Sequence, residues 1–210
     1  MITVIAVVNG AGKSSVVGSY IRNTGAEYFN PDEVCRELMK DDTKLSQGEA
    51  NARAWQMGYD QLNRAIENDL PYTFETTLGG NSVAEKLHEA IDKGVAVRIF
   101  FVGLSSPELH IERVKYRVSR GGHDIPEEKI RERWDGAIYN LITLIPRCSA
   151  VVVYDNSTPF REDGKTAAVC LFSLNGNVFV QLPIRDIPEW AKPLASTAME
   201  RVAKSQDNWR

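Results

Sequence analysis

Cysteine is scarce in this chain of 210 residues, and long apolar runs are missing from it. The three cysteines, Cys35, Cys148 and Cys170, are odd in number and lack Cys-x-x-Cys spacing, so we expect reduced packing residues rather than a disulfide framework or metal ligands. No run of about 18 apolar residues occurs, and the sequence begins with neither a basic segment nor a cleavage site. We therefore expect a cytoplasmic protein with no membrane partner.

Charge of one sign is not in excess either, because 25 lysines and arginines stand against 28 aspartates and glutamates, a net charge of −3. Apart from one cluster between Arg113 and Arg133, the basic residues are scattered, and the footprint of a duplex-binding protein is missing. A phosphorylated small molecule is therefore a better partner than nucleic acid. Internal repeats, low-complexity segments and long linkers are also missing, so the length predicts a single domain over residues 1–210.

The sequence opens instead with an apolar run that ends in a glycine-rich turn. Residues 2–8 are almost all apolar, which is typical of a central parallel strand covered on both faces. Gly10 and Gly12 then let the backbone approach an anion, and the N–H groups of the turn supply partial positive charge. Lys13 would reach the β- and γ-phosphates of a nucleoside triphosphate, and Ser14 would complete the shell of a Mg²⁺ ion. The expected nucleotide contacts are Asn9, Gly10, Ala11, Gly12, Lys13, Ser14 and Ser15.

This phosphate-binding loop departs from the usual pattern at one position. In G-x-x-x-x-G-K-[ST] the first glycine falls on Val7, whose β-branched side chain allows only extended or helical backbone. The glycines nearest the phosphates are retained, which favours a functional loop. The alternative is an ordinary strand, turn and helix with a solvated lysine.

Apolar periodicity and turn residues predict an alternation of strands and helices along the chain. We expect strands at 2–8, 25–29, 71–75, 95–103 and 150–154. We expect helices at about 12–23, 49–68, 82–93, 105–120 and 127–144, and a further helix that begins at 31. This rhythm predicts a doubly wound α/β fold with a parallel sheet and with ligands at the carboxyl ends of its strands. Two runs between 166 and 181, joined by an Asn-Gly turn, predict a C-terminal antiparallel hairpin, followed by a helix to about 204.

Polar residues that follow the strands are the candidates for chemistry, because ligands gather at that edge of the sheet. Asp32 follows the second predicted strand, and it could equally complement the dipole of the helix that starts there. Glu75 and Thr77 close the third strand, where the alternative is ordinary strand-edge polarity. Asn156, an expected nucleotide contact, lies after the fifth strand in the triplet 155–157, which could be a turn and nothing more.

Arginines gather in the basic cluster, on two predicted helices that are joined by Gly121 and Gly122. Arg113, Arg117 and Arg120 form one stripe on the first helix, and Arg131 and Arg133 lie on the second. The arrangement predicts a lid at about 117–133 that brings guanidinium groups onto a transferring phosphoryl group and excludes water. A solvated charged face is the alternative, and His123 in the hinge could contact a phosphate or cap the turn.

Six short motifs occur in order along most of the chain: Asn9-Gly-Ala-Gly-Lys-Ser14, Asn30-Pro-Asp-Glu-Val34, Phe74-Glu-Thr-Thr-Leu78, Phe101-Val-Gly-Leu-Ser105, Gly121-Gly-His-Asp-Ile-Pro126 and Tyr154-Asp-Asn-Ser157. Together they resemble the zeta-toxin-like P-loop kinases. The resemblance implies a P-loop NTPase with a nucleotide-kinase-like core. The characterised toxins of that family phosphorylate the 3′-hydroxyl of UDP-N-acetylglucosamine with ATP and Mg²⁺, so a nucleotide sugar is the implied acceptor.

The resemblance also implies roles for individual residues of this chain. Lys13 and Ser14 resemble the phosphate and Mg²⁺ contacts of the family, and Asp32 resembles the base that takes the proton of the sugar hydroxyl. Arginines of the lid and of the helix after it resemble clamps on the transition state. We expect these arginines to be Arg120 and Arg133.

Glu75 and Thr77 resemble substrate contacts of the family. In the family's core the third strand lies beside the first, so Glu75 could instead approach the water shell of Mg²⁺. The resemblance further implies an antitoxin protein as a partner. Toxins held by a small antitoxin tend to have an extra N-terminal helix, whereas this sequence starts directly at the first strand and has Val8 where relatives often have proline.

Three functions remain open from the sequence. The first is a kinase that acts on a nucleotide sugar, the second has the same mechanism with a small metabolite or nucleoside as acceptor, and the third is a nucleotide-sensing module without turnover. The loops after the second and third strands and the helix 49–68 would shape the acceptor pocket. On that helix Arg53 and Trp55 could reach a substrate, but packing or solvation is the favoured interpretation.

Overall fold

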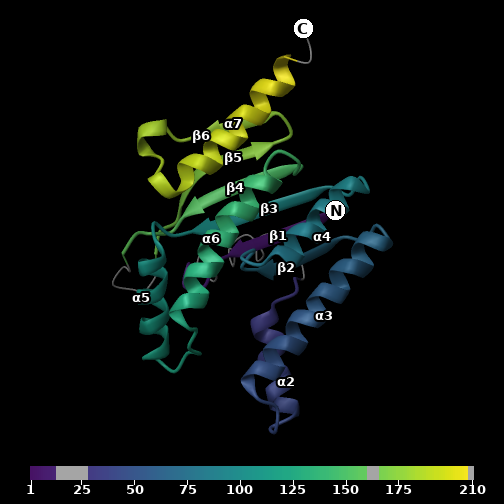
Figure 1. Ribbon diagram of the computed structural model, residues 1–210, viewed down its shortest axis with the longest axis vertical. Helices are drawn as coiled ribbons and strands as arrows, with labels where there is room; N and C mark the ends of the chain where they lie inside the picture. Colours follow the sequence, from purple (N-terminus) through teal and green to yellow (C-terminus); the bar gives the residue numbers. More distant parts are fainter. Residues whose placement is uncertain (13–27, 160–165, 208–210) are drawn as a thin grey trace.

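A mixed sheet forms the centre of the structure, a computed structural model that describes residues 1–12, 28–159 and 166–207 (Figure 1). Within these residues the sheet has six strands in the order β2-β1-β3-β4-β5-β6. The strands are β1 (Ile2–Val7), β2 (Tyr72–Thr76), β3 (Val97–Gly103), β4 (Ala150–Asp155), β5 (Val169–Asn175) and β6 (Val178–Gln181). The first four pair in parallel, and β5 and β6 form an antiparallel hairpin beside β4. The predicted α/β fold and its C-terminal hairpin are therefore confirmed.

The helices begin where the local sequence supplies caps. They are α2 (Pro31–Asp41), α3 (Gln47–Glu67), α4 (Asn81–Asp92), α5 (Pro107–Val118), α6 (Glu127–Leu144) and α7 (Lys192–Asp207), with short 3₁₀ turns at Ile184–Asp186 and Glu189–Ala191. Asn30 caps α2 by accepting a hydrogen bond from the backbone N–H of Asp32, and Ser46 forms a capping box with Glu49 at the start of α3. Among the described helices, none combines the length and apolar character that a membrane span requires.

The strand β1 is buried on both faces, which explains its continuous apolar sequence. On one face Ile2, Val4 and Ala6 join the main core with residues of α4, α6 and α7, which lie in front of the sheet in Figure 1. On the other face Ile5 and Val7 pack with residues of β3 and the loop after it. A strand enclosed in this way fixes the position of the loop that follows it.

The carboxyl ends of the parallel strands lie together at one edge of the sheet. Ile5 pairs with Glu75, Val7 with Val102 and Gly103 with Asp155, so the ends of β1, β2, β3 and β4 lie side by side at this edge. The predicted helix 12–23 and most of the predicted strand 25–29 lie outside the described residues. Of that strand, Phe29 forms a parallel bridge with Phe74 of β2. The helix predicted to reach 120 ends at Val118, because the backbone turns at residues 119–121.

Candidate active site

The loop after β1 has the backbone conformation that its glycines predict. Gly10 and Gly12 have φ values of 84° and 83°, a left-handed conformation that favours glycine. A Cβ atom on Gly10 would lie 2.9 Å from the carbonyl oxygen of His110, so no larger residue fits there. Val7 is the last residue of β1, and an extended position accepts a β-branched side chain without strain. Lys13, Ser14 and Ser15 lie outside the described residues.

Two buried polar side chains hold this glycine loop through its backbone carbonyls. His110 on α5 donates from Nδ1 to the carbonyl oxygen of Asn9 at 2.6 Å, and Asn156 donates from Nδ2 to the carbonyl oxygen of Ala11 at 2.7 Å. Both side chains are 0% exposed. Asn156, predicted as a nucleotide contact, thus contacts the backbone of the loop. His110 was not predicted, because a histidine on a helix gives no local sign that it will meet a loop so distant in the sequence.

Burial also sets the protonation of His110. Removal from water lowers its pKa to about 4, and the neighbouring Arg113 acts in the same direction, whereas the hydrogen bond to Asn9 opposes it. The imidazole is therefore neutral near pH 7, with its proton assigned to Nδ1 because a carbonyl oxygen only accepts. Among the described residues Nε2 has no hydrogen-bond partner.

A cavity of about 640 Å³ opens beside the glycine loop, between the start of α2 and α3 on one side and the segment 123–133 on the other. Its walls bring together five predicted site residues, which are Asn9, Asp32, Glu75, Thr77 and Arg133. They come from the loop after β1, from α2, from the end of β2 and from α6, which are far apart in the sequence. His123 also lines this cavity.

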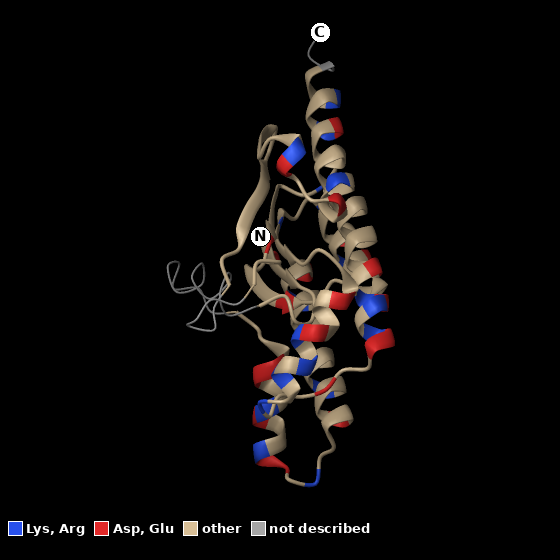
Figure 2. Ribbon diagram, turned by 90° about the vertical axis from the view of Figure 1, so that its left-hand side faces the viewer, with Lys and Arg blue, Asp and Glu red and all other residues tan. Residues whose placement is uncertain are grey.

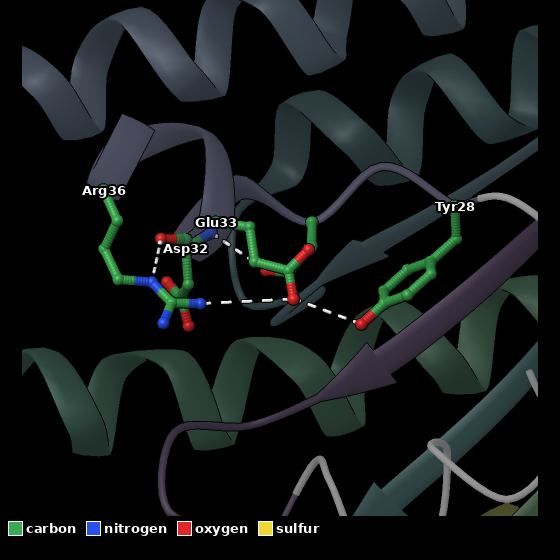
Figure 3. Close-up of polar contacts among 5 residues, drawn as sticks. Tyr28, Asp32, Glu33 and Arg36 are labelled. Carbon is green, nitrogen blue, oxygen red and sulfur yellow. Dashed lines mark hydrogen bonds and ion pairs between the residues drawn. The ribbon is translucent and has the colours of Figure 1, made fainter. Parts of the chain in front are cut away.

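Asp32 lies in the first turn of α2, where Figure 3 shows it with Glu33 and Arg36. Arg36 donates from Nε to the backbone oxygen of Asp32 at 3.2 Å, and its guanidinium lies 4.0 Å from the carboxylate of Glu33. Asn30 supplies the side-chain cap of the helix. Capping therefore does not require the carboxylate of Asp32, which lies on the cavity wall.

The loop after β2 carries Thr77 into the cavity in a constrained conformation. Leu78, the next residue, has a φ of 55°, which is unfavourable for a residue with a bulky side chain. Asn140 of α6 donates from Nδ2 to the carbonyl oxygens of Leu78 at 2.9 Å and of Gly80 at 3.2 Å. This buried amide holds the loop in place, and it was not predicted from the sequence.

The same loop packs directly against α6. A Cβ atom on Gly79 would lie 2.6 Å from the Cα atom of Arg133, and one on Gly136 would lie 2.2 Å from the carbonyl oxygen of Gly79. The glycines therefore allow backbone contact. Arg133, which is half-buried, donates from Nη1 to the Oδ1 atom of Asn9 at 2.8 Å. Thr77, Arg133 and the glycine loop are thus fixed relative to one another.

The predicted lid arginines point in different directions. Arg113 donates to the carbonyl oxygen of Thr158 at 2.9 Å, Arg117 donates to that of His123 at 2.7 Å, and Arg131 pairs with Glu108 at 2.6 Å. Arg120 is exposed and lies over the ring of Tyr116, 4.6 Å from its centroid. Of the two predicted clamps, Arg133 lines the cavity and Arg120 does not. Figure 2 shows that basic and acidic positions interleave along the helices.

The remaining predictions concern the three cysteines and the metal ligand. Cys35 and Cys148 are buried as expected, and burial raises the pKa of the Cys148 thiol to about 12. Cys170 is exposed, so the predicted packing role is wrong for this cysteine. In the part of the chain that the structure describes, no group of three or more histidine, cysteine, aspartate or glutamate side chains could hold a metal ion. The predicted Mg²⁺ ligand, Ser14, is outside that part.

Known proteins resemble this chain over most of its length. An uncharacterized protein of Haemophilus influenzae is 26% identical over 126 residues, which are 60% of this chain and 86% of that protein. The AvrRxo1-ORF1:AvrRxo1-ORF2 structure with sulphate ions is 13% identical with a TM-score of 0.65, covering 97% of this chain and 76% of that one. The corresponding structure with ATP is 14% identical with a TM-score of 0.62, and the match covers 94% of this chain and 63% of that one.

A further solved structure belongs to the PezAT chromosomal toxin-antitoxin system of Streptococcus pneumoniae. It is 12% identical with a TM-score of 0.54, and covers 99% of this chain and 87% of that one. At sequence identities this low, the similarity shows that these structures have the same fold as this protein. Residues 7–137, more than half of the chain, match the AAA domain family. The chain therefore belongs to the AAA domain family, and its glycine loop and mixed sheet give it a P-loop kinase-like fold.

Proposed function

We propose that this protein transfers the γ-phosphoryl group of ATP to a hydroxyl group of a small acceptor, with a nucleotide sugar such as UDP-N-acetylglucosamine as the leading candidate. One observation carries the proposal. A single cavity is lined by Asn9 of the glycine loop, by the carboxylate-bearing Asp32 and Glu75, and by Arg133. A phosphate-binding loop, a base and a cation at one cavity are the parts that phosphoryl transfer needs.

The glycine loop fits a nucleotide on its own geometry. The left-handed Gly10 and Gly12 turn the backbone tightly, and the lack of a side chain on Gly10 lets the loop pack against His110 of α5. Lys13 would bind the phosphates, and Ser14 would ligate a Mg²⁺ ion, which supplies charge neutralisation when bound. The AvrRxo1 structure that contains ATP supports this assignment.

The cavity residues would have three further roles: proton removal, orientation of the acceptor, and stabilisation of charge. Asp32 would take the proton of the acceptor hydroxyl while the acceptor oxygen bonds to the γ-phosphorus and the bond to the leaving oxygen of ADP breaks. Glu75 and Thr77 would orient the acceptor. Arg133, and Arg120 once the segment 117–133 closes as a lid, would stabilise the charge of the transferring group. The protein therefore acts by positioning and electrostatics.

A zeta-toxin-like role is the finer form of the proposal. It is supported by the order of the six motifs along the chain and by the fold shared with the PezAT structure, which belongs to a toxin-antitoxin system. An antitoxin protein would then be a partner that controls access to the cavity. A single kinase domain with a lid at 117–133 and a C-terminal hairpin fits the same role.

Labelled phosphoryl transfer tests the proposal. Purified protein is incubated with Mg²⁺, ATP labelled at the γ-phosphate, and UDP-N-acetylglucosamine, gluconate or nucleosides in separate reactions. We expect label on the nucleotide sugar. Label on gluconate or a nucleoside instead would identify the small-metabolite kinase, and ATP binding without labelling of any acceptor would identify the regulatory module.

A further inference from the structure

One end of the cavity is aromatic. Trp55 on α3 lines it, although 48% of this large side chain is exposed. Its ring stacks on that of Tyr59, with 5.0 Å between the centroids and 15° between the planes. The sequence favoured packing or solvation for Trp55, and the structure shows both, while it also places this residue on the wall of the cavity.

A small, mostly apolar annex of about 40 Å³ adjoins the cavity, and Trp55 lines both hollows. The annex and the cavity share walls, namely Pro31, Trp55, Glu75, Thr76 and Val83. Its other walls are Phe29, Gly58, Tyr59, Leu62 and Phe74. A Cβ atom on Gly58 would lie 2.6 Å from the ring of Phe29, so glycine at this position lets that ring approach α3. The annex therefore depends on close packing of aromatic rings.

The chemistry of the cavity changes from one end to the other. Near the glycine loop Asn9 and Arg133 line it, whereas aromatic rings dominate the annex beside α3, where Glu75 and Thr76 are the polar walls. An aromatic pair four residues apart on a helix stabilises that helix, which accounts for the stack of Trp55 on Tyr59. Helix stabilisation does not account for a tryptophan that forms a wall of both hollows. A planar ring in the ligand would complete that wall, because π faces stack regardless of the identity of the ring.

We propose that Trp55 determines acceptor specificity by stacking on a planar ring of the acceptor, such as a nucleobase. The annex then receives an apolar ring substituent of a few heavy atoms at most, in keeping with its volume of about 40 Å³. Pro31, a wall of both hollows, directly precedes Asp32, so the ring site adjoins the proposed base. This inference rests on the proposed function in one respect, which is that the cavity is the acceptor site.

Equilibrium binding without turnover tests the inference on the full chain. Uridine and adenosine, which carry a planar ring, and methyl glucoside, which does not, are titrated and followed by ligand-observed NMR. Trp55→Ala should raise the dissociation constants of the nucleosides roughly tenfold to hundredfold, the range for loss of one base–aromatic stack. Trp55→Phe keeps a ring and should raise them by less. Met57→Ala is the matched control, because Met57 is 43% exposed on the same helix and lies outside both hollows.

The outcomes separate this inference from the proposed function. Equal nucleoside affinity in Trp55→Ala and Met57→Ala would overturn it, as would a failure of both nucleosides to bind the unaltered protein. Loss of methyl glucoside binding together with nucleoside binding would also overturn it, because the platform would then bind sugars. Nucleoside binding that depends on Trp55 without any phosphoryl transfer would support the inference and reject the kinase. Phosphoryl transfer to a nucleoside that Trp55→Ala leaves unchanged would do the reverse.

Discussion

The two walls of the cavity hold their polar side chains in different ways. On the wall formed by the glycine loop, Asn9 is buried and accepts from Arg133. The buried His110 and Asn156, which do not line the cavity, support this wall by hydrogen bonds to the backbone of the loop from distant parts of the sequence. On the opposite wall, which comes from α2 and α3, Asp32 and Asn51 are exposed. Asn30 and Arg36 bond to the backbone of Asp32, and Cys35 of α2 donates to Asn51 of α3. The first wall is thus part of the folded core, whereas the second is a surface.

Because of this difference, we expect one wall to affect the stability of the fold and the other to affect the choice of acceptor. A buried polar group that loses its partner costs about 1 to 3 kcal/mol, so changes in the glycine-loop wall should affect both folding and nucleotide binding. Substitutions at exposed positions usually change stability by less than about 0.5 kcal/mol. The acceptor wall can therefore change its chemistry while the fold is retained. We expect the donor site to follow from the fold and the acceptor to be set by a few surface residues.

The largest expected effect comes from Asp32 on the acceptor wall. Asp32→Asn should lower the rate of phosphoryl transfer by roughly 10²- to 10⁴-fold, because asparagine cannot take the proton of the acceptor. The free energy of unfolding should change by at most about 1 kcal/mol, since Asn30 supplies the cap of α2. Steady-state kinetics and chemical denaturation measure the two quantities. Glu33→Gln is the control, because Glu33 is exposed in the same helical turn and does not line the cavity. Near-normal transfer by Asp32→Asn would leave this residue a role at the helix start only.

Arg133 and Arg120 give the next largest effect and test the lid. Arg133→Ala should lower kcat by roughly 10²- to 10³-fold, the range for removal of one preorganised donor to the transition state. Arg120→Ala should lower kcat less, because Arg120 lies over Tyr116 away from the cavity. In both variants kcat should fall more than KM rises if the contact forms mainly in the transition state. Comparable losses in the two variants would show that the lid closes far enough to bring Arg120 to the phosphates.

The local sequence was sufficient to predict helices and strands and part of the candidate site. The apolar run of β1, the caps of α2 and α5, and the Asn-Gly turn of the hairpin are short-range signals, and each of them predicted its element. Asp32, Glu75 and Thr77 could be predicted because they follow strands whose ends share one edge of the sheet.

The side chains that hold the loops of the site in place could not be predicted in this way. His110 bonds to a carbonyl group 101 positions away in the sequence, and Asn140 bonds to one 62 positions away. Such contacts depend on how α5 and α6 pack, which no short motif records. The direction of each lid arginine depends on the same packing, so the sequence could not separate Arg133 from Arg120.

A pair of asparagines sharpens the comparison of the walls. Asn156→Ala should lower the free energy of unfolding by about 1 to 3 kcal/mol, because it leaves the buried carbonyl group of Ala11 without its donor. It should also weaken ATP binding, because the glycine loop loses its support. Asn51→Ala, on the exposed acceptor wall, should cost less than about 1 kcal/mol and leave ATP affinity unchanged. Thermal denaturation and nucleotide titration of both variants measure the contrast. Equal destabilisation by the two substitutions would show that burial does not distinguish the walls.

The last expected effect is a dependence of stability on pH that belongs to the glycine-loop wall. The folded-state pKa of His110 is about 4 and its ordinary value is 6.5, so between these values the unfolded chain binds more protons than the folded one. Stability therefore falls as pH decreases through this window, by at most about 1.4 kcal/mol per pH unit from this group. His110→Asn keeps a donor for the carbonyl group of Asn9 and cannot titrate, so its stability should fall less steeply. Partial burial and Arg147 also lower the pKa of His88, but that group contributes equally to both proteins. The difference between the two denaturation curves thus isolates His110, and parallel curves would show that the imidazole can be protonated in the folded protein.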